Sequence, residues 1–194
     1  MNIEFARAFK TAFCLPVLFF AVSGTASAQT GVAPRWEVFG GYSYMRLDSP
    51  SFGFANYSNL NGWNIQGTVN ITLKLSATID FSGHYGSQLR DFTYMIGPQY
   101  TWRRDRSKFF VHGLFGKAQN RVDITVGSSS GFQGVGRAFA AGGGYDWDYN
   151  PRLSFRVVQA DYINGNAFGT TQNDIRISTG VIFRFGQIGH RPRL

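Results

Sequence analysis

Three side chains in one segment could do hydrolytic chemistry. Asp80, Ser82 and His84 are spaced two apart, so an extended chain places all three on one face. A serine hydrolase needs a hydroxyl in contact with a base, and an acid that orients the base. Residues two apart on a strand are about 6.6 Å apart, too far for Ser82 and His84 to share a hydrogen bond. The spacing favours a structural role for His84, as a hydrogen-bonding residue of the interior.

The other candidates for site chemistry are isolated. His84, His112 and His190 are far apart in the sequence and are not grouped with acids at metal-ligand spacing. The glycine run 142–144 lies inside a predicted strand, whereas a phosphate loop lies between a strand and a helix. We therefore predict no catalytic residue, no cofactor and no metal site.

The chain begins with the pattern of an export signal. A positively charged leader precedes the apolar run 12–22, and Ala26-Ser27-Ala28 matches the small-x-small site of signal peptidase. The run is shorter than the about 20 residues that a membrane helix needs. Cys14 lies inside the leader, so the exported protein would contain no disulfide bond. We predict a signal peptide at 1–28, one β-barrel domain at 29–185 and a short basic tail at 186–194.

The rest of the chain alternates between apolar and polar residues, which is the pattern of β-strands. In the clearest segment, Trp63, Ile65, Val69 and Ile71 alternate with polar side chains. Similar patterns predict eight strands of about the 9–11 residues that a tilted membrane strand requires. The predicted strands are 36–47, 63–71, 75–85, 92–102, 109–118, 139–147, 153–162 and 174–185.

Three residues within these strands need separate predictions. Pro98 lacks a backbone donor, so we expect a β-bulge there. Alternation places Arg156 outward near the periplasmic end, where its long side chain could reach the headgroups. His112 lies on a strand with apolar residues on both faces, and we place it inward because lipid is the less favourable surrounding.

Strands that cross a membrane must close into a barrel, because every backbone N–H and C=O in hydrocarbon needs an internal partner. The connections alternate between long segments at 48–62, 86–91, 119–138 and 163–173 and tight turns at 72–74, 103–108 and 148–152. This alternation is typical of bacterial outer-membrane barrels, whose short turns are periplasmic. We therefore predict an all-β fold, an eight-stranded antiparallel up-and-down transmembrane β-barrel whose lumen is filled by side chains.

Aromatic residues fall at both ends of the predicted strands, as expected for rings at headgroup level. The predicted periplasmic belt is Trp36, Trp102, Phe109, Trp147 and Phe185, and the predicted outer belt is Tyr44, Trp63, Tyr85, Tyr94 and Tyr162.

The chain resembles the small bacterial outer-membrane β-barrels, the family that includes the transmembrane domain of outer membrane protein A. The most specific element is the terminal Ser178-x-Gly180-x-x-Phe183-x-Phe185, which is similar to the signal that the barrel-assembly machinery reads. Weaker elements are Gly40-Gly41-Tyr42 and Gln159-Ala160-Asp161-Tyr162. Family members usually end on the aromatic, whereas this chain continues to Leu194. The resemblance implies an outer-membrane location, with the assembly machinery and periplasmic chaperones as partners during biogenesis.

Strand alternation directs several charged residues into the lumen. They are Glu37, Asp80, His84, Asp146, Asp161, Arg176 and Arg184. Joining the last two strands places Asp161 opposite Arg176, and a buried acid needs such a partner to offset its desolvation. We interpret the set as a structural salt-bridge network that fills the barrel.

Several functions remain open at this point. The formal charge is +8, which could indicate nucleic acid, but an exported chain favours anionic lipid headgroups as the partner. We expect a monomeric, non-enzymatic outer-membrane barrel with an envelope-structural role or a surface-contact role through loop 119–138. The alternatives are a narrow gated channel and an outer-membrane lipid-modifying enzyme. A soluble carrier of apolar ligands would need an apolar lumen, whereas Asn64 and Gln66 point inward.

Overall fold

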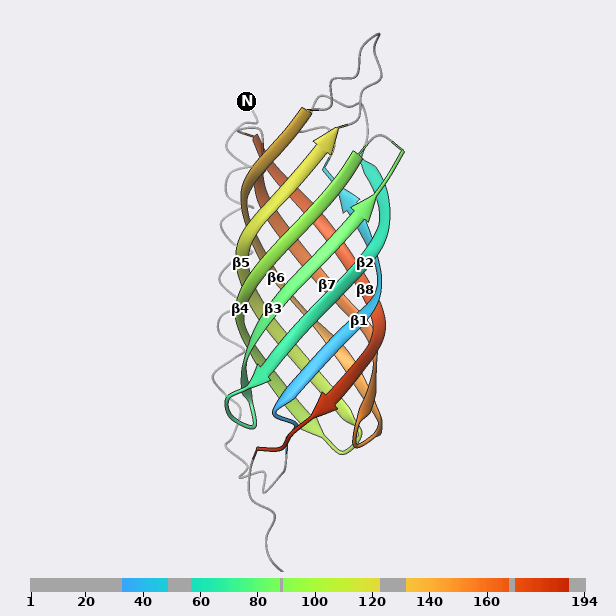
Figure 1. Cartoon of the computed structure of the whole chain (residues 1–194), viewed down its shortest axis with the longest axis vertical. Helices are drawn as coiled ribbons and strands as arrows, with labels where there is room; N and C mark the ends of the chain where they lie inside the picture. The colour runs from blue at the N-terminus through green and yellow to red at the C-terminus, as the bar shows by residue number, and fades with distance from the viewer. Residues whose placement is uncertain (1–32, 49–56, 88, 123–131, 168–169, 189–194) are drawn as a thin grey trace, which may run out of the picture. The chain divides into compact units, whose positions relative to one another are not determined.

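The computed structural model contains a closed barrel of eight antiparallel strands (Figure 1). It describes residues 33–48, 57–87, 89–122, 132–167 and 170–188, so the predicted signal peptide and most of the tail lie outside the described residues. The strands are β1 (Trp36–Leu47), β2 (Ser58–Asn70), β3 (Leu75–Tyr85), β4 (Leu89–Arg104), β5 (Ser107–Val122), β6 (Phe132–Asn150), β7 (Leu153–Ala167) and β8 (Thr170–Phe185). Each strand pairs with the next, and β1 pairs with β8 to close the ring. The predicted fold class is confirmed.

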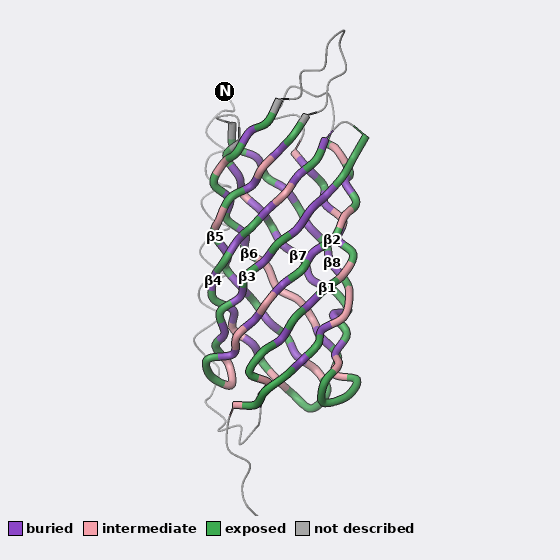
Figure 2. The backbone as a smooth tube through the Cα atoms, in the orientation of Figure 1, coloured by how far each residue is buried: buried purple, intermediate pink, exposed green. Residues whose placement is uncertain are grey.

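Side chains alternate between the outer surface and the interior along most of each strand, as the banded tube in Figure 2 shows. Ile65, Ile79 and Phe81 are 47%, 44% and 47% exposed, whereas Gln66 and Asp80 are buried. The barrel thus has an apolar exterior and a largely polar interior, the reverse of a soluble protein. This arrangement is stable only where the exterior contacts an apolar solvent. None of the described residues belongs to a helix that is long and apolar enough to cross a membrane.

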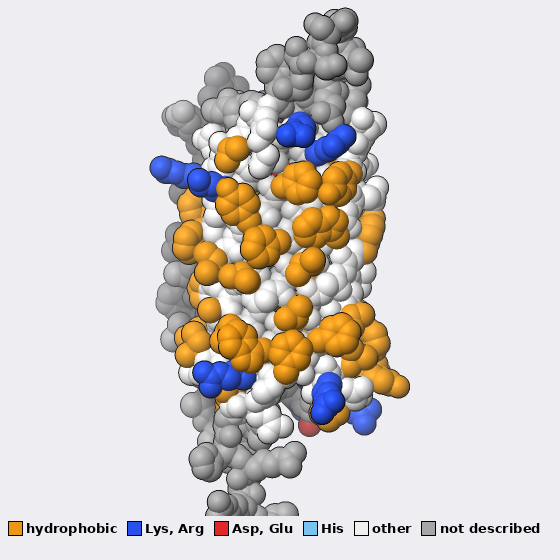
Figure 3. All heavy atoms as spheres, viewed as in Figure 1, with side chains coloured by type: hydrophobic (Ala, Val, Ile, Leu, Met, Phe, Trp, Pro, Cys, Tyr) orange, Lys and Arg blue, Asp and Glu red, His pale blue; other side chains and the backbone are white. Residues whose placement is uncertain are grey.

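Apolar side chains cover a broad band of the outer surface between the two rims (Figure 3). Trp36, Trp102, Phe109 and Phe185 are exposed at the rim of short turns, and Trp63, Tyr85, Tyr94 and Tyr162 are exposed nearer the other rim. Lys and Arg side chains lie near both ends of this band (Figure 3). The order apolar, aromatic, cationic along the barrel matches the order of hydrocarbon, interface and headgroup in a bilayer.

The strands extend further toward the outer rim than the sequence predicts. β2 begins at Ser58 and β4 at Leu89, while β5 ends at Val122 and β6 begins at Phe132. The predicted loop 119–138 was therefore too long: only 123–131 separates the two strands, and those residues lie outside the described part of the chain. Polarity alternation cannot locate a strand end in water, because polar residues there are favourable on either face.

Two predictions about register were wrong. β4 keeps one register with β5 on both sides of Pro98, so there is no bulge; only Gly97 and Pro98 drop out of that ladder. The bulge lies instead in β7, between Arg156 and Gln159, where Val157 and Val158 are both exposed. Two consecutive outward residues shift the alternation by one, so Arg156 points into the barrel and is buried.

Glycines line the seam where β1 meets β8. Gly41 and Gly180 are register partners, and a Cβ added to Gly41 would lie 2.0 Å from the carbonyl oxygen of Thr179. Beyond the barrel, Gly186 adopts a positive φ of 66°, and Ile188 then pairs with Ala33 through two backbone hydrogen bonds of 2.8 and 3.0 Å. Both described chain ends are joined at the rim of short turns.

Candidate functional site

The centre of the barrel is crossed by an ionic cluster built on Arg176 of β8. Its guanidinium donates to Asp80 of β3 from Nη1 at 2.8 Å and to Asp161 of β7 from Nη2 at 2.7 Å. Asp161 is the register partner of Arg176, whereas Asp80 lies on a strand that is not a neighbour of β8. All three side chains are fully buried. The cluster therefore ties opposite walls of the barrel together.

Arg156 forms a second ionic group, nearer than the Arg176 cluster to the rim of short turns. Its guanidinium lies 4.4 Å from the ring centre of Phe39 and 4.3 Å from that of Phe110, so two phenyl rings enclose it. It donates to Asp146 at 2.8 Å and also to Gln66 and Gln159. The sequence pattern missed Arg156 because the bulge of β7 reverses its direction.

Two glutamines connect the ionic groups. Gln66 accepts from Arg156 and donates to Asp80 at 2.6 Å. Gln159 accepts from Arg156 at 2.6 Å and donates to Asp161 at 2.7 Å. Each glutamine uses both ends of its amide, so the two layers form one hydrogen-bonded network.

His112 extends this network on β5, where its Nε2 lies 2.8 Å from Oδ1 of Asp161. The structure places His112 in the interior.

His84 contacts a serine that the sequence pattern did not suggest. Its Nε2 is hydrogen-bonded to Oγ of Ser43 at 2.8 Å, and its Nδ1 lies 3.7 Å from Oδ2 of Asp91. Ser82 instead pairs with Thr93 at 2.5 Å. The order serine, histidine, aspartate matches a hydrolase, but all three are buried and Ser43 is also bonded to Ser178 at 2.9 Å. A nucleophile enclosed in this way cannot meet a substrate.

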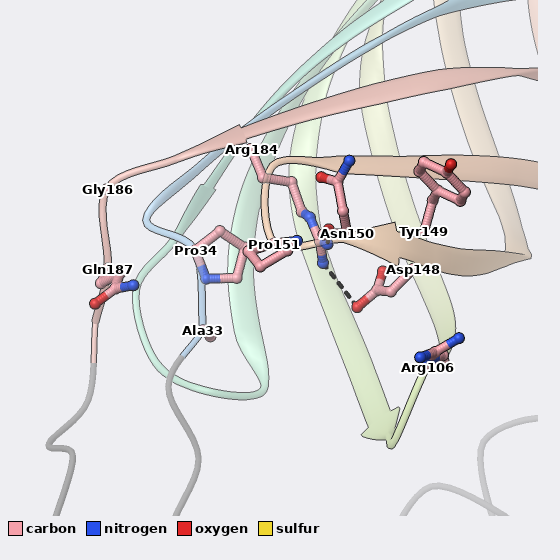
Figure 4. A pocket seen from close by; sticks show the side chains of 10 residues that line it. All are labelled: Ala33, Pro34, Arg106, Asp148, Tyr149, Asn150, Pro151, Arg184, Gly186 and Gln187. Atoms are coloured by element: carbon pink, nitrogen blue, oxygen red, sulfur yellow. Dashed lines mark hydrogen bonds and ion pairs between the residues drawn. The ribbon is translucent and has the colours of Figure 1, made fainter.

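The rim of short turns carries a third ionic group. Lys108 lies 3.5 Å from Glu37 and 3.4 Å from Asp148, and Arg184 lies 2.7 Å from Asp148. Figure 4 shows the Arg184–Asp148 pair beside a pocket of about 400 Å³. Pro34, Pro151 and Tyr149 also line this pocket. Glu37 and Asp148 thus balance the charges of Lys108 and Arg184.

The outer half of the interior contains an apolar cluster beside buried polar groups such as the Asn120–Gln172 pair. The cluster is built from β1, β2, β4, β5, β6 and β7: Met45, Leu47, Leu60, Leu89, Met95, Leu114, Ala118, Ala138, Ala140 and Ile163. Leu60 and Leu89 fall in segments that were predicted to be loops. The cluster lies on the outer side of the Arg176 network, so the lumen is closed by two different kinds of packing.

Three acids lie near the outer end of the interior. Asp174 is one residue beyond Ile175, the outermost apolar residue of β8 on the outer face, and is buried. Burial raises the pKa of Asp174 to about 7, and the charges of Asp91 and Asp48 also raise it. A hydrogen bond of 2.7 Å from the backbone N–H of Asp48 opposes this shift. Among the described residues, no group of three or more His, Cys, Asp or Glu side chains could hold a metal ion.

Comparisons with known proteins place the fold. No protein-family model and no curated protein matches the sequence. The structure is similar to Neisserial surface protein A, with a TM-score of 0.58 and 14% identity over 80% of this chain and 99% of that one. It is also similar to Ail, the attachment invasion locus protein of Yersinia pestis, in complex with the heparin analogue sucrose octasulfate, with a TM-score of 0.56 and 15% identity over 76% of this chain and 97% of that one. The chain has the fold of the small eight-stranded bacterial outer-membrane β-barrels.

Proposed function

We propose that this protein is an integral outer-membrane barrel without enzymatic activity, with an envelope-structural or surface-contact role. The observation that carries the proposal is the closed lumen. The fully buried Arg176 network crosses the centre, and the apolar cluster from Met45 to Ile163 packs in the outer half. A pore needs a continuous path for water, and packed side chains at both levels oppose one.

The surface-contact role is supported by the length of the strands beyond the apolar band. On β5 the outward apolar residues end at Phe115, and the strand continues to Val122. β6 extends equally far, so the two strands hold loop 123–131 on a rigid base. The Ail structure contains a heparin analogue, which supports surface contact as a use of this fold.

Two measurements test the proposal. First, the purified protein should migrate differently on a gel with and without boiling, and vesicles should protect its strands from protease. Equal mobility together with full solubility after removal of the leader would contradict the membrane barrel. Second, planar bilayers containing the protein should show no conductance steps, with a general porin as the positive control. Reproducible steps would favour the narrow-channel alternative.

The enzymatic alternative has its own test. Lipid A from cells that overproduce the protein should have the same mass spectrum as lipid A from cells that lack it. The variant Ser43→Ala removes the hydroxyl that is hydrogen-bonded to His84. A modification that appears with the wild type and disappears with Ser43→Ala would overturn the non-enzymatic assignment.

A further inference from the structure

Two cations lie directly opposite each other on the outer surface of the barrel. Lys117 of β5 and Arg137 of β6 are register partners, and both side chains are exposed on the outward face. Such partners have Cβ atoms about 5 Å apart, and like charges at that distance destabilise a sheet. Among the described residues, no carboxylate forms an ion pair with either cation. Asp123, the one acid between them in sequence, lies outside that part of the chain.

The same sector carries two more cations further toward the rim. Arg121 follows Lys117 by four residues on the same face, and its register partner on β4 is Arg90. The outer ends of β1, β2, β7 and β8 carry one exposed cation among the described residues, Arg46, whose guanidinium lies 4.6 Å from the ring centre of Tyr57. Neutral pairs also lie there: Tyr44 donates to Asn59 at 2.8 Å and Tyr162 donates to Asn173 at 2.6 Å. Positive charge is therefore concentrated on β4, β5 and β6.

An apolar groove lies next to the Lys117–Arg137 pair, on the side that faces the middle of the barrel. It has a volume of about 450 Å³, and Gly113, Phe115, Phe139, Ala141 and Tyr162 help to line it. Gly113 pairs with Ala141, Phe115 pairs with Phe139, and the two cations form the next outward rung. Gly113 and Ala141 contribute little side-chain volume to the groove, whereas Phe115, Phe139 and Tyr162 contribute aromatic rings. One surface thus joins an apolar groove to two cations that no carboxylate of the described residues pairs with.

We propose that β5 and β6 bind one phosphorylated glycolipid of the outer leaflet. Its phosphate lies between Lys117 and Arg137, and one acyl chain fills the groove over Gly113 and Ala141. A guanidinium and an ammonium together match a phosphate, the first as a bidentate donor and the second as a compact charge. The proposal rests on the proposed function, because the outer-membrane orientation places this rim in the leaflet that contains phosphorylated glycolipid. A phospholipid of the other leaflet would meet the rim of short turns instead.

The test is a titration of the purified mature protein in micelles with bisphosphorylated, hexa-acylated lipid A, followed by native mass spectrometry. We expect one bound lipid A, held at least tenfold more tightly than the same lipid without its phosphates. Each removed cation should weaken binding about fivefold, so the double variant K117Q/R137Q should bind about 25-fold more weakly. Its matched control is R104Q/R106Q, which removes two exposed cations from the β4–β5 turn at the other rim.

A second pair of variants tests the groove. A Cβ added to Gly113 or to Gly40 would meet no atom within 4 Å, so both positions accept a larger residue without disturbing the backbone. Gly113→Leu fills the groove and should weaken both forms of the lipid at least fivefold, whereas Gly40→Leu on β1 should weaken neither.

Distinct results would overturn the proposal. Equal binding of the two lipid forms, or equal losses in K117Q/R137Q and R104Q/R106Q, would exclude a phosphate site. Displacement of the lipid by a sulfated disaccharide at stoichiometric concentration, with no effect of Gly113→Leu, would indicate a soluble-glycan site instead. The heat-dependent gel shift of each variant reports barrel formation separately. Any of these results, in a protein that keeps the shift, overturns this site alone, whereas loss of the shift in the wild type would contradict the proposed function and the site with it.

Discussion

Arg176 of β8 reaches across the barrel to Asp80 of β3, with Nη1 2.8 Å from Oδ1 and Nη2 3.0 Å from Oδ2. The two residues are 96 positions apart, and their strands share no ladder. Backbone pairing holds each strand only to its two neighbours. The Arg176–Asp80 pair therefore fixes the cross-section of the barrel in a direction that the sheet alone leaves free.

Replacement of the central cation should destabilise the barrel strongly. Arg176→Met leaves Asp80 and Asp161 buried without a cation, and we expect the free energy of unfolding to fall by about 3–5 kcal/mol. Urea titrations followed by tryptophan fluorescence in vesicles measure this change. The triple variant R176M/D80N/D161N has no buried charge left in the cluster and should recover most of the loss. A triple variant as unstable as Arg176→Met would show that volume, not charge, dominates the effect.

Two adjacent glycines of β1 should respond differently to the same substitution. An alanine at position 41 would place its Cβ 2.0 Å from the Thr179 carbonyl oxygen, whereas Gly40 has no atom within 4 Å of such a Cβ. We expect Gly41→Ala to cost about 1–3 kcal/mol of unfolding free energy, because the β1–β8 seam must open to admit it. Gly40→Ala should be neutral or stabilise by up to about 1 kcal/mol. The same urea titration compares them, and equal effects would contradict the close approach at the seam.

Asp174 should make stability fall as pH rises. Its pKa is raised to about 7 in the folded protein, above the value of about 3.9 for an unfolded chain. The folded state therefore favours the protonated acid, and its contribution is fully present below pH 4 and is lost as pH rises toward 7. Asp174→Asn should stabilise the protein at pH 8 by at most about 4 kcal/mol and leave it unchanged at pH 3.5.

The asparagine can still accept the hydrogen bond from the Asp48 N–H through its side-chain oxygen. Unfolding midpoints of the wild type and Asp174→Asn at several pH values test this prediction. Parallel pH profiles for the two proteins would show that Asp174 does not titrate in this range.

The terminal aromatic should matter more for assembly than for stability. Phe185 ends the predicted assembly signal and is exposed, as is Phe109 at the same rim. Phe185→Ala and Phe109→Ala remove similar apolar area, so their unfolding free energies should differ by less than about 0.5 kcal/mol. In cells we expect Phe185→Ala to lower the folded, heat-modifiable fraction several-fold and Phe109→Ala to leave it near wild type. Similar losses in both would argue against a terminal signal.

Much of the fold could be predicted from local pattern. Segment 63–71 alternates cleanly because lipid and lumen demand opposite polarity, and each residue has only one acceptable face. The pairing of Asp161 with Arg176 followed from the same rule, because their strands are sequence neighbours. The outer aromatic belt followed from ring chemistry at an interface.

The remaining features depend on contacts that no local pattern contains. Arg156 points inward because Val157 and Val158 are both outward, and a pair of valines carries no signal for a bulge. The link between Arg176 and Asp80 crosses the lumen, so sequence spacing cannot suggest it. Leu60 and Leu89 extend the interior into segments that composition assigns to loops, because the outward face of a strand beyond the membrane is polar and the usual alternation is lost.

One edge of β1 pairs with β8, the last strand to be synthesised, so this edge stays unpaired until the rest of the barrel has been made. Trp36 emerges from the ribosome long before its partner Phe185. Until then β1 presents a bare edge, which in other sheets recruits foreign strands. A chain truncated before Thr170 lacks β8, so the ring cannot close and two strand edges stay unpaired. Such a chain should be degraded by proteases rather than inserted.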